Sequence, residues 1–292
     1  MSDYVWFITA AASGFGEAIA FEALRRGHKV IATARNSAKL SVLKAAGAAV
    51  MDVDVTSDDE TLAAKLSEAN AIYGKITHVV NAAGYILVGA IEEATQKEVF
   101  DTYNTNVLGC FNIARAAIPH LRAAAATRSD SNGNIALANF GSLGSWSSGA
   151  AVAHYCSTKF AVTGLTEGLR DELAPFGIDV CVVEPGYTRT GILVSGNGDA
   201  KGRVLTRREL AVYEGTTTAT ARSAMEKTNG KQPGDVEKCA RVIVDVMTRK
   251  GGKEVPARLV TGTDCLEVVR ERCNDTLRLV SKWEDVSSSV MY

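Results

Sequence analysis

The sequence has almost no net charge, and this removes two classes of partner. Its 292 residues carry 32 Lys and Arg against 33 Asp and Glu, which leaves a formal charge of −1. Proteins that bind nucleic acid or an anionic membrane through their overall field carry an excess of positive charge. We therefore expect neither nucleic acid nor a membrane as a partner.

Signals for metal sites and disulfide frameworks are also missing. The six cysteines are scattered without a CxxC pair, and the four histidines lie far apart. Zinc sites and small disulfide scaffolds both need closely paired ligands or paired cysteines. We expect that the protein binds no metal and that its thiols are reduced.

Targeting signals and long apolar runs are lacking as well. The first residues, MSDYVWFIT, include Asp3 and no basic residue before a short apolar run. A secretory signal starts with basic residues, and a membrane span needs roughly 18 consecutive apolar residues. The default expectation is a cytoplasmic protein.

The remaining composition, 46% hydrophobic and 22% charged, is that of an ordinary globular protein. Short apolar runs alternate with helical patterns along most of the chain, which is typical of βαβ units and a parallel sheet buried on both faces. The predicted strands are 5–9, 28–34, 49–53, 76–81, 135–140, 179–183 and 258–261, and the predicted helices are 14–26, 38–46, 60–72, 104–126 and 154–173. We expect a single α/β domain over residues 1–292.

Two segments fall outside this alternation. Residues 193–234 are polar without a clear period, and such a stretch inside an α/β domain is typical of a substrate lid. Residues 263–292 have a helical pattern and form a C-terminal extension. That extension is expected to pack either on a partner subunit or on the lid.

The N-terminal stretch VWFITAAASGFGEAIAFEALRRG predicts a strand, a tight turn and a helix. The start of a helix offers unpaired N–H groups and a positive dipole end, which together bind a pyrophosphate. Gly14 and Gly16 keep the turn open, and Ser13 can donate to a phosphate oxygen. Ala10 stands where such turns have their first glycine, and a positive φ there costs about 1 kcal/mol. The alternative is a glycine-containing helix start that binds nothing.

The stretch AHYCSTKFAVTGL places Tyr155 and Lys159 four residues apart on one helix face. A neighbouring ammonium stabilises a phenolate and lowers the pKa of a tyrosine, which gives a proton donor or base. Ser142 follows a predicted strand thirteen residues earlier, and Asn106 lies inside an apolar helix. Alone, the pair is equally typical of an ordinary helix surface.

Together these motifs make the chain similar to the short-chain dehydrogenase/reductase family over about residues 4–262. The family's TGxxxGxG turn matches residues 9–16 with its first glycine replaced, and its NNAG signature matches residues 81–84 with Ala82 for the second asparagine. The family's Pro-Gly turn beside the nicotinamide matches Pro185-Gly186. The resemblance implies a Rossmann-like doubly wound parallel sheet of about seven strands.

The resemblance also implies a role for each site residue. Ser142 would bond the substrate carbonyl and Tyr155 would donate the proton. Lys159 would hold the nicotinamide ribose and depress the phenol pKa, and Asn106 would fix a water. The expected cofactor contacts are Thr9, Ala11, Ser13, Gly14, Phe15, Gly16, Arg35, Asp54, Val55, Asn81, Ala82, Gly84, Tyr155, Lys159, Pro185, Gly186, Thr188 and Thr190. In the plainer alternative Ser142 only ends its strand and Asn106 only ties a helix to a strand.

The cofactor preference follows from the end of the second predicted strand, VIATARN. A free ribose 2′-OH calls for a carboxylate here, whereas a 2′-phosphate calls for a cation. Ala34 stands where NAD-preferring relatives have aspartate, and the guanidinium of Arg35 follows at once. We expect NADP(H), unless Arg35 is simply a solvated surface residue.

The function expected from the sequence is NADPH-dependent reduction of a ketone or aldehyde on a small to medium hydrophobic substrate. The sequences of the N-terminal turn and of the VIATARN stretch are similar to those of fungal members of the family, some of which serve secondary metabolism. Relatives pair through the two long helices, so a homodimer or homotetramer is expected. Two alternatives stay open: a silent NADP(H)-binding regulatory protein, and an enzyme with an added cyclisation or dehydration.

Overall fold

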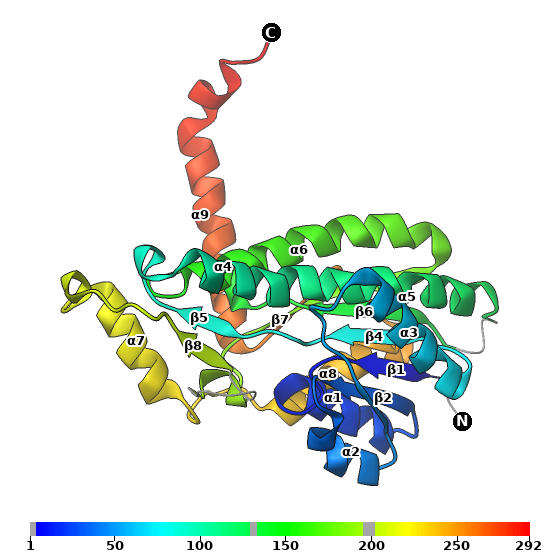
Figure 1. Cartoon of the computed structure of the whole chain (residues 1–292). Coiled ribbons are helices and arrows are strands. Elements are labelled where there is room, and N and C mark those ends of the chain that lie inside the picture. Colours follow the sequence, from blue (N-terminus) through cyan, green and yellow to red (C-terminus); the bar gives the residue numbers. More distant parts are fainter. Residues whose placement is uncertain (1–3, 129–132, 195–201) are drawn as a thin grey trace.

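A computed structural model describes residues 4–128, 133–194 and 202–292. Seven parallel strands form one sheet in the order β3-β2-β1-β4-β6-β7-β9 (Figure 1). The strands are β1 Val5–Ile8, β2 Lys29–Ala34, β3 Ala49–Asp52, β4 His78–Asn81, β6 Ile135–Phe140, β7 Ile178–Pro185 and β9 Arg258–Thr261. The predicted doubly wound α/β fold and its seven strands are confirmed.

Both faces of the sheet are buried, and β1 shows why its sequence is continuously apolar. Trp6 and Ile8 pack into the cluster that contains helices α1 (Gly14–Arg25), α2 (Ser41–Ala45) and α8 (Val236–Met247). Val5 and Phe7 point to the opposite face. That face is covered by α3 (Asp59–Tyr73), α5 (Gly109–Ala126) and α6 (Ala153–Leu173) (Figure 1). Alternate residues of a strand thus fill two separate cores.

Several helices are defined by local signals. Asp58 caps α3 by accepting from the Thr61 N–H, and Gly74 ends it with φ of +75°. The helix α4 (Gln96–Tyr103) begins with a capping box between Thr95 and Glu98. The side chain of Asp235 caps α8. Sequence analysis missed α4 and α8, although α8 carries a helical apolar stripe.

The predicted helix 104–126 differs at its start. Residues Asn104–Leu108 form one wide π-helical turn between α4 and α5. Such turns are rare and displace side chains from the regular helical positions. The turn contains Asn106, one of the predicted site residues.

The segment predicted as a lid, 193–234, contains regular structure. Strand β8 (Arg203–Leu205) pairs in parallel with β5 (Ile86–Val88), and α7 (Thr217–Thr228) follows. These elements lie together at one end of the molecule (Figure 1). Residues 195–201 of the predicted lid lie outside the described residues. The β5–β8 pairing was not visible in the sequence, because strands of three residues are too short to show an alternating pattern.

The lid is attached to the body around Glu93, a fully buried carboxylate. Glu93 accepts from the backbone N–H groups of Ala90 and Leu210 and pairs with Arg222 of α7. Arg208 donates to the carbonyls of Glu92 and Glu93. The lid is therefore fastened by charged hydrogen bonds rather than by a large apolar core.

The predicted C-terminal extension is one helix, α9 (Thr263–Ser288), which projects from the body (Figure 1). Its first turn is anchored by the buried Cys265, and Arg272 donates to Ser147. Farther out, Leu277, Val280 and Trp283 are exposed. Across the described residues, none of the helices combines the length and apolarity that a membrane crossing requires.

Candidate functional site

The predicted site residues converge at the carboxyl edge of the sheet, since they follow β1, β4, β6 and β7. In a doubly wound sheet this edge binds ligands where the strand order reverses. Two contacts join the segments directly. The Ala82 N–H donates to Thr9 Oγ1 over 3.0 Å, and a Cβ on Gly14 would lie 3.6 Å from Thr190 Cβ.

The turn after β1 adopts the strained form considered in the sequence analysis. Ala10 has φ of +51° and Gly14 has φ of +60°. A Cβ on Gly16 would lie 2.6 Å from the Ala10 carbonyl oxygen, so only glycine fits there. The Ala11 N–H donates to Thr33 O over 2.9 Å and fixes the turn against β2. The chain therefore forms the dinucleotide-type turn despite the missing glycine.

The start of α1 is open toward solvent. Its N-cap, Ser13, is extended and exposed, and its hydroxyl makes no capping bond. The first N–H groups of a helix need partners, and the cap side chain of Ser13 supplies none. The side chain of Phe15 packs on Phe140 with ring centroids 5.0 Å apart. This helix start fits the pyrophosphate of a dinucleotide.

Two predicted cofactor residues have their side chains engaged elsewhere. Asn81 Nδ2 donates to Cys110 O and to Asn139 Oδ1, so its side chain points into the core. Asp54 accepts from the N–H and hydroxyl of Thr56. A cofactor contact by Asn81 would have to use its backbone.

The remaining predicted cofactor residues lie along the same edge. Arg35 is exposed directly after β2, and Val55 is buried beside Gly109. Gly186 lies under Asp264, whose carboxylate accepts from the Tyr187 N–H. Thr188 donates to Gly186 O, and Thr190 caps the turn at 191–193.

Tyr155 and Lys159 lie one turn apart on α6, both nearly buried. Lys159 Nζ lies 5.7 Å from the centre of the Tyr155 ring and donates to Phe140 O over 2.7 Å. A Cβ on Gly84 would lie 3.7 Å from the same Nζ, which places the 81–84 segment beside the amine. The structure thus brings the predicted pair together next to the predicted cofactor segment.

Burial controls the ionisation of both groups. It raises the pKa of Tyr155 to about 12, against the lowering effect of a hydrogen bond with Ser142. Burial also lowers the pKa of Lys159 to about 8. The direction of the Tyr155 shift is opposite to the lowered phenol pKa expected from the sequence, because desolvation of the phenolate outweighs the hydrogen bond with Ser142.

Ser142 is held in place from both sides. Its hydroxyl accepts from the Gly144 N–H over 3.0 Å, and its own N–H donates to Ser145 Oγ over 3.2 Å. Ser145 in turn donates to Lys159 O over 3.0 Å. Ser145 therefore connects the loop after β6 to helix α6.

Asn106 is fixed by three bonds. Its Nδ2 donates to Tyr85 O and Thr158 Oγ1, and its Oδ1 accepts from the Tyr85 N–H. A Cβ on Gly84 would lie 3.2 Å from that Oδ1. The π-helical turn thus ties α5 to the segment after β4 and to α6.

Sequence analysis missed a buried acid in this site. Glu184, at the end of β7, is fully buried and forms a two-bond ion pair with Arg258 of β9. It also accepts from Trp146 Nε1 over 2.8 Å and from Thr163 Oγ1 over 3.0 Å. The guanidinium of Arg258 lies 3.5 Å from the Trp146 ring centre. An acid in the otherwise apolar run CVVEPG is the signal that could have revealed it.

An apolar cluster covers Tyr155, the predicted proton donor. Tyr155 packs with Ile86, Val88 and Leu193, and Ile192 lies against them. Met225 and Ala221 of α7 complete the cover. Parts of the segment predicted as a lid, Leu193 and α7, therefore contribute to the apolar cover next to the phenol.

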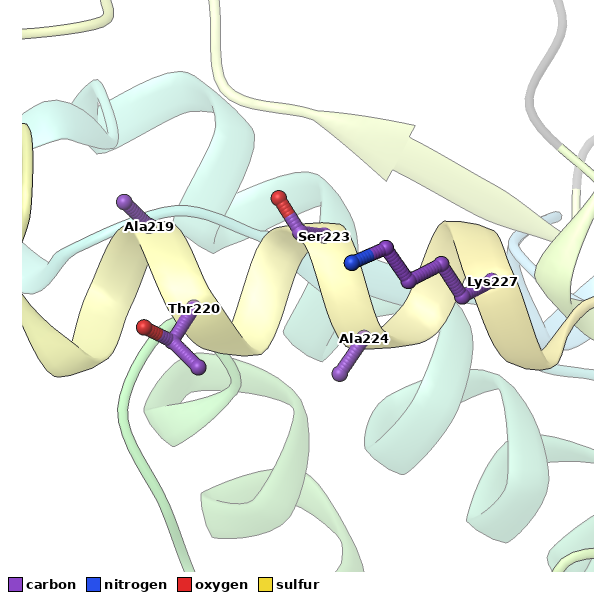
Figure 2. Close-up of a pocket in the computed structure, with 5 residues that line it drawn as sticks. All are labelled: Ala219, Thr220, Ser223, Ala224 and Lys227. Carbon is purple, nitrogen blue, oxygen red and sulfur yellow. The ribbon is translucent and has the colours of Figure 1, made fainter.

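A separate pocket of about 380 Å³ runs along α7. Figure 2 shows its lining side chains, Ala219, Thr220, Ser223, Ala224 and Lys227, which all come from that helix. Neither Tyr155 nor Ser142 lines it, so it is not the catalytic cleft. Within the ranges that the structure describes, no group of three or more metal-ligating side chains is present.

Comparison with known proteins agrees with this geometry. The sequence profile for short chain dehydrogenase matches residues 4–200. The chain is 32% identical over 287 residues to the oxidoreductase BOA17 of Botryotinia fuckeliana (strain B05.10), with 97% of each chain covered. It is 32% identical over 201 residues to a 3-ketodihydrosphingosine reductase of Bacteroides thetaiotaomicron, with 68% of each covered.

Solved structures give the same result. A short-chain dehydrogenase from Streptomyces avermitilis superposes with a TM-score of 0.85 at 33% identity, and the match covers 99% of both chains. Because this match extends over the whole length, it includes the lid and α9.

Replacing Ala10 by glycine tests the strain in the turn. In the wild type, the left-handed backbone conformation of Ala10 costs about 1 kcal/mol of stability. Ala10→Gly relieves this strain, and the gain offsets the stability lost because glycine makes the unfolded chain more flexible. The φ of Ala12 is not positive, so Ala12→Gly relieves no strain. This variant only makes the unfolded chain more flexible, which destabilises the fold. We expect Ala10→Gly to be about 1 kcal/mol more stable than Ala12→Gly in urea unfolding. Equal stabilities would contradict the strained turn.

The pKa of Lys159 predicts a pH-dependent stability. Below pH 8 the amine is protonated in both states; between about 8 and the unfolded value of 10.5 only the unfolded chain keeps the proton. The free energy of unfolding therefore gains up to about 1.4 kcal/mol per pH unit from this group as pH rises. Urea unfolding from pH 7 to 10 should show this rise in the wild type relative to Lys159→Met. Parallel curves would show that the amine is not desolvated.

Proposed function

Because the chain belongs to the short-chain dehydrogenase/reductase family, whose members use a nicotinamide cofactor, we propose that it is an NADPH-dependent reductase of a ketone or aldehyde. The observation that carries this proposal is the buried Tyr155–Lys159 pair beside Ser142. The bound cofactor supplies a hydride to the carbonyl carbon.

The chain's own residues handle the charge and the proton. As hydride arrives, negative charge develops on the carbonyl oxygen, and fixed donors stabilise that charge more than they stabilise the ketone. Ser142 donates to this oxygen, and Tyr155 delivers the proton from its hydroxyl. Its raised pKa keeps the phenol protonated near pH 7, which is the state that reduction requires. The ammonium of Lys159 then stabilises the phenolate.

The cofactor contacts support NADP(H). The open start of α1 and the turn at 9–16 suit the pyrophosphate, and Gly84 with Lys159 lies where the nicotinamide ribose is held in the family. Arg35 follows β2 with no carboxylate at Ala34, and a guanidinium suits a 2′-phosphate by charge and geometry.

The substrate proposed is a small to medium hydrophobic carbonyl compound. The apolar cluster around Tyr155 supports a hydrophobic body. The relative named as a 3-ketodihydrosphingosine reductase supports reduction of a ketone, and the full-length similarity to a fungal oxidoreductase supports a place in secondary metabolism.

A homo-oligomer is part of the proposal. Large apolar side chains are exposed along α4, the π-helical turn and α6, at Phe100, Leu108, Phe160 and Leu165. Helices with such faces bury them against a second copy, as relatives of this family do through the same helices.

Loss of the phenol hydroxyl tests the proton donor. Tyr155→Phe should lower kcat for carbonyl reduction by at least about 100-fold, the usual contribution of general acid catalysis. NADPH affinity, measured by cofactor fluorescence, should stay close to wild type. Tyr103→Phe, which loses a hydroxyl bonded to Ser157 on the same helix, is the control and should keep its activity. NADPH binding without consumption by the wild type would favour a silent regulatory protein.

Charge reversal at Arg35 tests the cofactor preference. Arg35→Asp removes the phosphate partner and repels the 2′-phosphate, so the ratio of kcat/KM for NADPH over NADH should fall at least about tenfold. Lys44→Asp makes the same charge change on exposed α2 and should leave the ratio unchanged. An unaltered ratio in Arg35→Asp would refute the assignment.

A further inference from the structure

Arg203 of β8 is a buried cation without adequate partners. The residue is 4% exposed, and its Nε and Nη1 have no hydrogen-bond partner among the described residues. Among the described residues, Glu226 of α7 is an acid near it, with Nη2 and Oε1 separated by 3.8 Å. That distance is too long for a hydrogen bond, and the Glu226 side chain is 62% exposed.

Two other arginines of the lid, Arg208 and Arg222, do have acceptors for their guanidinium groups. Arg208 donates to the carbonyls of Glu92 and Glu93, and Arg222 pairs with Glu93 and Glu209. A guanidinium carries five N–H donors, and taking them out of water without acceptors is costly. The unpaired guanidinium N–H groups of Arg203 can therefore donate to an acceptor on a bound molecule.

Arg203 lies beside the apolar cluster that packs on Tyr155. In the parallel β5–β8 pair it stands opposite Ile86, so the two side chains share one face of the ribbon. Ile86 belongs to the apolar cluster that packs on Tyr155. The Arg203 N–H donates to Val194 O, next to Leu193 of the same cluster. On its other side Glu226 adjoins Met225, which also packs there.

We propose that Arg203 recognises a carboxylate on the substrate, and this rests on the proposed carbonyl reduction at Tyr155. A carboxylate accepts two parallel hydrogen bonds from one edge of a guanidinium. One cation in an apolar wall balances one negative charge, whereas a phosphate dianion would leave a charge unbalanced. The substrate is then a keto or aldehyde acid with an apolar body.

This role carries a cost that can be measured. A buried cation that waits for a substrate destabilises the substrate-free protein, so an apolar side chain of similar length should fit better. We expect Arg203→Met to have a higher urea midpoint of unfolding than the wild type. A cation with a structural role would give the opposite sign.

Matched substrates test recognition directly. A series of linear keto acids and their methyl esters is assayed with NADPH, since each pair differs only in the charge. The wild type should favour the best acid over its ester at least about tenfold in kcat/KM. Arg203→Met should abolish this preference by raising KM for the acid, with KM for the ester unchanged. Arg207→Met, which removes an exposed cation from the same lid, should retain the preference.

Binding measurements separate this inference from the proposed reaction. The acids and esters are titrated into the NADP⁺-loaded wild type and Arg203→Met proteins by calorimetry. If an acid binds the wild type selectively but no probe consumes NADPH, the carboxylate site stands and the proposed reduction fails. Equal handling of acids and esters, binding of neither, or a lower unfolding midpoint for Arg203→Met would each overturn the inference.

Discussion

The ion pair of the buried Glu184 with the partly exposed Arg258 is the constraint on which the site's geometry depends. Glu184 receives donors from Arg258, Trp146 and Thr163, so one carboxylate joins β7, β9, the loop after β6 and helix α6. Removing a charge from water is costly unless its hydrogen bonds are all satisfied, and here both carboxylate oxygens have two partners. Such a fully satisfied network fixes relative positions more strictly than apolar packing does.

The predicted site residues on these elements are attached to this network within a few residues. Ser142 precedes Trp146 on the same loop, Lys159 lies one helical turn before Thr163, and the Pro185-Gly186 turn directly follows Glu184. Ser145 adds a second link between the serine loop and α6. The Glu184 network thus holds the elements that carry the predicted catalytic groups, whereas the lid is attached mainly through Glu93.

Much of this arrangement could be predicted from the sequence, and the misses have physical reasons. The positions of the seven strands along the chain and the spacing of Tyr155 and Lys159 on one helix follow from local periodicity, and the structure confirms both. The pairing of Glu184 with Arg258 joins residues 74 positions apart, and no local pattern encodes it. The direction of the Tyr155 pKa shift depends on how deeply the lid buries the phenol, which helix spacing does not reveal. Asn81 was predicted as a cofactor contact, and its amide nitrogen donates to Asn139 inside the core, which no local pattern reveals.

Helix α9 has a consequence for how the protein denatures. Beyond its first turns it is supported by local pairs such as Arg278 with Asp275 rather than by the sheet. A helix held by so few tertiary contacts is expected to fray before the body unfolds. The three tryptophans are divided between the parts: Trp6 and Trp146 lie in the body, and Trp283 lies on the projecting helix. Circular dichroism is therefore expected to include the fraying of α9, whereas the fluorescence of the buried Trp6 follows the cooperative unfolding of the body.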